Sequence, residues 1–134
     1  MDDVTPSDFT RAKAYFDRFV AAFNTFDGVQ VAQLFVAPVV AMRGDGSLIS
    51  LSQQNDIRHY YQAALDRYHR DGCRSCQWSD LSVASMGRRA VLATVTWDLL
   101  RDDGTVLTRW RQSYSLSLFG DDGPKAFAAV SHAE

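Results

Sequence analysis

The sequence lacks the features that mark membrane, secreted and nucleic-acid-binding proteins. Its longest apolar run, residues 34–42, is interrupted by Pro38, and it is far shorter than the roughly 20 residues of a membrane helix. The first residues, Met1-Asp2-Asp3, carry acid where a secretory signal carries base. Fourteen Lys and Arg against sixteen Asp and Glu give a net charge of −2, so clustered positive charge for phosphates is missing. We expect a cytoplasmic protein that binds neither nucleic acid nor membrane.

Cysteine is also scarce, with two residues in the segment Cys73-Arg74-Ser75-Cys76. A redox pair needs its first thiol at a helix N-terminus, where the helix dipole lowers the thiol pKa. Here the pair follows Gly72, which suits the end of a helix. Together with His69 the thiols could supply three zinc ligands, but a structural zinc normally takes four. A disulfide is a further alternative. We expect two ordinary thiols, no metal site and no cofactor.

Apolar residues are plentiful, and they predict one folded domain over residues 1–134. They make up 46% of the chain, and aromatic residues make up 12%. A chain of this length can bury roughly two-thirds of its unfolded surface around a single core. We find no internal repeat, low-complexity tract or linker that would separate a second domain.

Helical spacing predicts three helices. The first spans the first 25 residues, begins at a capping box formed by Thr5, Pro6 and Asp8, and has one apolar stripe: Phe9, Ala12, Phe16, Phe19, Val20 and Phe23. A short second helix covers Val29 to Val36 and ends before Pro38. The third begins after Ser50 or Ser52, ends at Asp71-Gly72, and has an aromatic face: Ile57, Tyr60, Tyr61, Ala64, Leu65 and Tyr68.

The remaining segments predict antiparallel strands. Residues 39–42 and 48–51 form a hairpin around the glycine-containing turn 43–47, and four longer strands follow over residues 76–85, 89–101, 105–119 and 125–132. If Asp103 and Gly104 are the central residues of a type I′ turn, the numbers of opposing residues sum to 207. One face then pairs Trp97 with Trp110, Val95 with Gln112, Ala93 with Tyr114 and Val91 with Leu116. The other face is polar and pairs Asp98 with Arg109, Thr96 with Arg111 and Thr94 with Ser113.

These segments resemble the nuclear transport factor 2-like superfamily, which includes ketosteroid isomerase, scytalone dehydratase, limonene-epoxide hydrolase and SnoaL-type polyketide cyclases. The resemblance rests on residues 19–27 leading into 34–38, on Gly44-Asp45-Gly46, on Thr96-Trp97 and on Asp103-Gly104 with residues 114–116. It implies an α+β, cystatin-like fold in which a cone-shaped, curved antiparallel sheet wraps around three N-terminal helices. It also implies an internal pocket and a homodimer formed through the outer sheet face.

The family's catalytic groups are poorly matched in this sequence. Tyr15 could take the part of an oxyanion-stabilising tyrosine, but the strand after the second helix carries no proton-transfer group where an isomerase would hold its carboxylate. Asp98, Arg109 and Arg111 could mimic the Asp-Arg-Asp set of an epoxide hydrolase, although the predicted register turns them outward. We expect His59 and His132 to be structural or exposed residues rather than bases.

The aromatic residues lead to our main hypothesis. They either fill the core or line a pocket for a small hydrophobic molecule that carries rings, and the predicted pocket residues are Phe16, Phe19, Phe23, Tyr61, Trp97, Trp110, Gln112 and Tyr114. One alternative is an isomerase, dehydratase or hydrolase that uses Tyr15, His59 or Asp98 with Arg109 as acid–base groups. Another is a non-catalytic dimerisation or protein-interaction domain whose cone is filled by side chains.

Overall fold

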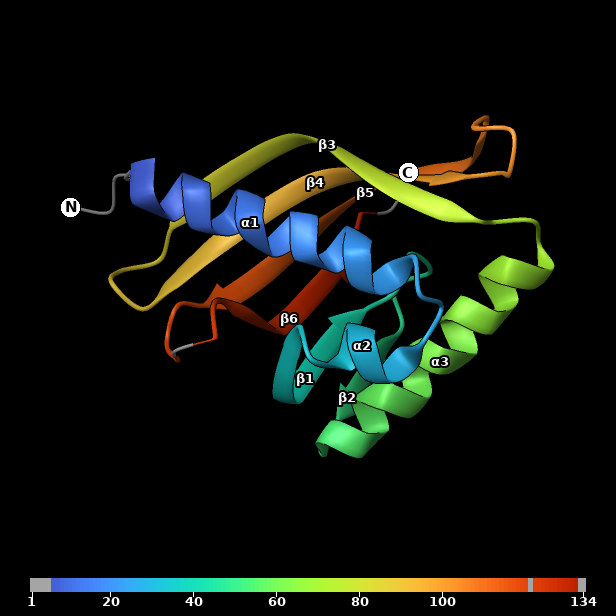
Figure 1. Cartoon of the computed structure of the whole chain (residues 1–134). Coiled ribbons are helices and arrows are strands. Elements are labelled where there is room, and N and C mark those ends of the chain that lie inside the picture. The colour runs from blue at the N-terminus through green and yellow to red at the C-terminus, as the bar shows by residue number, and fades with distance from the viewer. Residues whose placement is uncertain (1–5, 121, 133–134) are drawn as a thin grey trace.

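Three helices pack against one curved, six-stranded sheet in a computed structural model that describes residues 6–120 and 122–132 (Figure 1). In chain order the elements are α1 (Pro6–Phe23), α2 (Gly28–Ala32), β1 (Phe35–Met42), β2 (Leu48–Leu51), α3 (Gln54–Arg70), β3 (Ser75–Ser85), β4 (Ala90–Leu100), β5 (Val106–Ser117) and β6 (Lys125–Ser131). The strand order is β2-β1-β6-β5-β4-β3. This confirms the predicted α+β cone, except that β1 and β6 pair in parallel.

Helix α1 crosses one face of the sheet, as its apolar stripe predicts (Figure 1). Ala12, Phe16 and Phe19 on this stripe are buried. Phe9 is 42% exposed, because burial of the helix begins about one turn later, at Ala12. Tyr15 is fully buried beside the stripe, although the sequence analysis did not place it in the core. Thr5 of the predicted cap lies outside the described residues.

The second helix is shorter than predicted. Asp27 caps it by accepting a hydrogen bond from the Val29 amide at 2.9 Å, and the helix ends at Ala32. Phe35 already lies in strand β1, which runs through Pro38. A proline is tolerated there because the β1–β6 register shifts between Phe35 and Val40, so that no regular ladder hydrogen bond is lost at Pro38.

Helix α3 starts later than predicted, at Gln54. Its N-cap is Gln53 rather than Ser50 or Ser52, because the Asp56 carboxylate accepts a hydrogen bond from the Gln53 amide at 3.0 Å. Its end is confirmed: Asp71 caps the helix, and Gly72 follows with a φ of +106°. That left-handed conformation favours glycine.

The predicted register of the long central hairpin is confirmed, but its turn differs. Trp97 lies opposite Trp110 and Asp98 opposite Arg109, while Leu100 pairs with Val106 after a bulge. The Gly104 amide donates to the Arg101 carbonyl, and Gly104 itself has a φ of +84°. The loop is therefore a tight turn followed by a left-handed glycine, which absorbs the extra residue and preserves the register.

Alternation along the strands separates an inner face, covered by the helices, from an outer face. On β1 Val39 is fully buried and Val40 is half exposed, and on β6 Ala129 is buried while Val130 is 41% exposed. None of the helices in the described part of the chain is long and apolar enough to cross a membrane. The core lies between α1, α3 and the inner sheet face, where the site described next is found.

Candidate functional site

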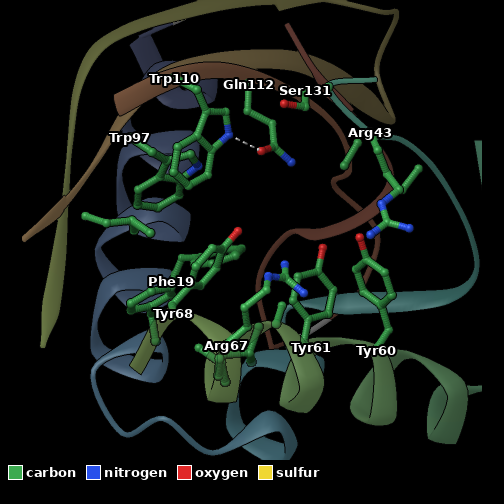
Figure 2. Close-up of a pocket in the computed structure, with 18 of the residues that line it drawn as sticks. Phe19, Arg43, Tyr60, Tyr61, Arg67, Tyr68, Trp97, Trp110, Gln112 and Ser131 are labelled. Carbon is green, nitrogen blue, oxygen red and sulfur yellow. Dashed lines mark hydrogen bonds between the residues drawn. The ribbon is translucent and has the colours of Figure 1, made fainter. Parts of the chain in front are cut away.

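The inner face is not packed solid, because a cavity of about 400 Å³ opens between α3, the C-terminal half of α1 and the sheet (Figure 2). Helix α1 contributes Phe19 and Phe23 to the wall, and α3 contributes a continuous face from Tyr60 to Tyr68. The opposite wall consists of inward side chains of β4, β5 and β6: Trp97, Leu99, Thr108, Trp110, Gln112, Tyr114, Ala129 and Ser131. The volume falls in the range of small-molecule sites.

Seven of the eight residues predicted from the sequence border this cavity: Phe19, Phe23, Tyr61, Trp97, Trp110, Gln112 and Tyr114. The eighth, Phe16, does not. It is fully buried on the part of α1 that packs directly on the sheet, with its ring centroid 6.3 Å from Trp78 and 5.1 Å from Tyr15. Phe16 lies on the same helical stripe as Phe19 and Phe23, and this shared position does not predict which of the three side chains borders the cavity.

Two indole–side chain hydrogen bonds fix the aromatic wall. The Trp97 indole N–H donates to the Tyr114 hydroxyl oxygen at 2.8 Å. The Trp110 indole N–H donates to the Gln112 amide oxygen at 2.7 Å, as Figure 2 shows. Each bond occupies an acceptor on the wall, so the Tyr114 hydroxyl proton and the Gln112 amino group remain available as donors.

Burial keeps three tyrosine hydroxyls in this region neutral. Desolvation raises the pKa of Tyr61 and of Tyr114 well above the ordinary value, and it also raises the pKa of Tyr68. A neutral hydroxyl carries its proton and can donate a hydrogen bond. The Tyr61 hydroxyl points into the cavity and has no hydrogen-bond partner among the described residues (Figure 2).

The polar residues at the cavity mouth are not among those predicted from the sequence. Arg43, in the turn after β1, and Arg67, on α3, border the opening together with Tyr60. In Figure 2 their polar ends lie along one side of the open space, beside the Tyr61 hydroxyl. The spacing of Tyr60 and Arg67, seven residues apart on a helix, was a usable signal for this arrangement.

The candidate catalytic residues lie away from the cavity. The buried Tyr15 hydroxyl donates to the Leu34 carbonyl at 2.9 Å, and His59 is exposed on α3. Asp98, on the outer face, accepts two hydrogen bonds from Arg109, from Nε at 2.5 Å and from Nη2 at 3.0 Å. These bonds hold the pKa of Asp98 below its usual value.

The other two candidates also lie off the cavity. Arg111 donates to the Asp80 carbonyl and to the Thr96 hydroxyl, and exposed His132 is hydrogen-bonded to Ser113. Among the described residues that line the cavity there is no Asp, Glu or His.

The two cysteines are free thiols in the structure. Cys73 and Cys76 are both buried, and burial raises the pKa of each thiol. His69 packs its ring against Phe26 instead, with 5.1 Å between the centroids. Within residues 6–120 and 122–132, no group of three or more His, Cys, Asp or Glu side chains is placed to hold a metal ion.

Solved structures of other proteins share this architecture at low sequence identity. A cystatin-like protein of unknown function from Nostoc punctiforme PCC 73102 superposes with a TM-score of 0.77 at 11% identity, over 98% of this chain and 95% of that chain. Aln2 from a Streptomyces species gives 0.73 at 17% identity, over 97% and 93%. An NTF2-like protein with a cystatin-like fold from Novosphingobium aromaticivorans gives 0.73 at 13%, over 95% and 82%. Identities this low show a shared fold alone.

Sequence comparison gives the family. No curated protein matches the chain in sequence. The family model described as "NTF2-like protein (DUF6841)" matches residues 7–134, nearly the whole chain. The protein therefore belongs to the DUF6841 family of NTF2-like proteins.

Proposed function

We propose that this protein binds a small hydrophobic molecule with rings in the cavity between α3 and the sheet. The observation that carries the proposal is the wall itself, which surrounds about 400 Å³ and includes eight aromatic side chains. Trp97 and Tyr114 are held in place by their hydrogen bond, and the Phe19 ring lies 5.1 Å from the Trp97 ring. A preformed apolar wall with a few fixed polar groups is the usual form of a small-molecule site.

The wall favours binding over acid–base catalysis. A base or acid must lie within hydrogen-bond reach of the proton that it transfers. Tyr15, His59 and Asp98 do not border the cavity, and burial raises the pKa of the Tyr61 and Tyr114 hydroxyls that do. We therefore place the isomerase, dehydratase or hydrolase alternative second.

Binding can be tested with naphthalene-2-carboxamide, a neutral two-ring compound, followed through tryptophan fluorescence. Trp97 and Trp110 border the cavity, so a bound ring changes their emission. Ala64→Phe fills the opening from α3, since Ala64 borders the cavity. Ala63→Phe is the matched control, because the neighbouring Ala63 is exposed and does not border it.

We expect the wild type and the Ala63→Phe variant to bind the probe with similar affinity, and the Ala64→Phe variant to lose at least about tenfold. Far-ultraviolet circular dichroism checks that both variants fold. Equal binding by the two variants, or no binding by any form to this probe and to its carboxylate analogue, contradicts the proposal.

We also propose that the protein forms a homodimer through the outer sheet face. One row of paired residues crosses this face from β4 to β1 in the observed register: Leu92, Ser115, Ala128 and Val40. Leu92 and Val40 are 38% and 50% exposed, and Val130 nearby is 41% exposed. Exposed apolar side chains on a sheet face favour burial against a partner, and a second copy presents the same surface.

Light scattering after size exclusion tests the dimer. We expect a dimer for the wild type and a monomer for the Val130→Asp variant. Val106→Asp, at a residue of similar exposure at the end of the β4–β5 hairpin, should leave the dimer intact. A monomeric wild type at micromolar concentration contradicts the proposal.

Two unpaired buried thiols also support the expected cytoplasmic location, which fractionation of a tagged protein tests.

A further inference from the structure

Two arginines border the cavity mouth without forming an ion pair with any carboxylate of the described chain. Arg43 and Arg67 both border the opening and both are exposed. The ion pairs among the described residues are Lys13–Asp17, Arg109–Asp98 and Lys125–Asp122, none of which lies at the mouth. Two arginines thus border one opening on a chain whose net charge is −2.

The acids nearest in sequence to these two arginines have other partners. Asp45, in the same turn as Arg43, accepts hydrogen bonds from the Ser47 amide at 2.9 Å and from the Ser47 hydroxyl at 2.6 Å. Asp66, next to Arg67, accepts a bond from the Gln62 amide group at 2.9 Å. The Ser47 hydrogen bonds and, to a smaller extent, the charge of Arg43 lower the pKa of Asp45. Neither arginine forms an ion pair among the described residues.

The interior adds hydrogen-bond donors. The Tyr61 hydroxyl is protonated, unpartnered among the described residues and directed into the cavity. The Gln112 and Tyr114 oxygens accept from indole groups, which leaves their N–H and O–H groups to donate. A ligand that supplies acceptor oxygens at the mouth and apolar surface at the aromatic wall would satisfy both parts of the site.

We infer that the ligand is a hydrophobic carboxylic acid, whose rings lie against Trp97 and Trp110 while its carboxylate is bound at the mouth by Arg43, Arg67 and the Tyr61 hydroxyl. The inference rests on the proposed function and names its ligand class. A guanidinium group can donate two parallel N–H hydrogen bonds to the two oxygens of a planar carboxylate. A ligand amide or alcohol has one oxygen and cannot accept this pair of bonds. Arg67 is already oriented by the Tyr68 ring, 5.4 Å from its guanidinium carbon.

Three probes with the same ring system test the charge. They are naphthalene-2-carboxylate, naphthalene-2-carboxamide and 2-naphthylmethylammonium, which carry charges of −1, 0 and +1 at neutral pH. We expect the carboxylate to bind at least about tenfold more tightly than the amide, and the ammonium compound to bind most weakly. The preference should fall as salt is raised, because exposed arginines are screened.

Variants then assign the charge to the mouth. The double variant Arg43→Gln/Arg67→Gln should lose the preference for the carboxylate over the amide. Arg70→Gln, on the same helix but away from the cavity, should keep the full preference.

Three outcomes are decisive against part of this account. Equal binding of all three probes overturns the charge inference while the proposed function stands. A carboxylate preference that survives the double variant overturns the assignment to Arg43 and Arg67. Failure of all probes to bind overturns the proposed function itself, and with it this inference.

Discussion

Replacing Tyr114 with Phe removes one oxygen atom and leaves a buried donor without its partner. The Tyr114 hydroxyl accepts the Trp97 indole N–H at 2.8 Å, and both residues are 3% exposed. Removing the partner of a buried donor lowers the free energy of unfolding by about 1–3 kcal/mol, because the donor has lost its hydrogen bonds to water and forms none in the folded protein. For a chain of this size that loss lowers Tm by roughly 3–10 °C.

Two other tyrosines provide graded controls for the same chemical change. In Tyr61→Phe the lost hydroxyl has no hydrogen-bond partner among the described residues, so we expect a change below about 0.5 kcal/mol. In Tyr15→Phe the Leu34 carbonyl loses one donor but keeps the Ala126 amide at 2.9 Å. The expected loss is about 1 kcal/mol, because the carbonyl is not left unpaired.

Urea unfolding followed by circular dichroism at 25 °C measures all three variants against the wild type. Equal m-values would show that the substitutions leave the surface exposed on unfolding unchanged. The free energies of unfolding can then be compared directly. The predicted order of destabilisation is Tyr114→Phe, then Tyr15→Phe, then Tyr61→Phe. A Tyr114→Phe loss no larger than that of Tyr61→Phe would refute the reasoning, since it would mean that cavity water already satisfies the indole.

Three further predictions concern packing, pH and thiol chemistry. Gly28→Ala should destabilise by about 1–3 kcal/mol in urea unfolding, because its Cβ would lie 2.7 Å from an α3 carbonyl, whereas Gly44→Ala, with 3.6 Å to its nearest atom, should not. The hydrogen bonds from Arg109 lower the pKa of Asp98, so they stabilise the fold above about pH 4 and this stabilisation is lost as pH falls through the lowered pKa. In Asp98→Asn the free energy of unfolding should therefore fall less steeply as pH is lowered. Cys73 and Cys76 should react with Ellman's reagent at pH 8 slowly in native protein and rapidly in denaturant, since burial raises both pKa values; rapid native reaction would contradict this.

The sequence was most informative where a local rule decides the structure. The register that places Trp97 opposite Trp110 follows from the alternation of apolar and polar residues on β4 and β5. A slip by one residue would turn both tryptophans to the outer face. The turn type was wrong although the register was right, because two kinds of loop can join the same pair of strands. The start of α3 was wrong for a similar reason: Gln53 with Asp56 competed with two nearby serines as a cap.

The sequence by itself determined the elements, the inner and outer faces and the aromatic character of the interior, because these depend on spacing within each segment. Tertiary structure alone decided that Phe16 lies in solid core while Phe19, one turn further along the same helix, borders an opening. It also decided that Arg43 and Arg67, from a turn and a helix far apart in the chain, border the same cavity. Free volume and the convergence of charges arise from how the helices sit on a curved sheet, and no periodicity within one segment records that.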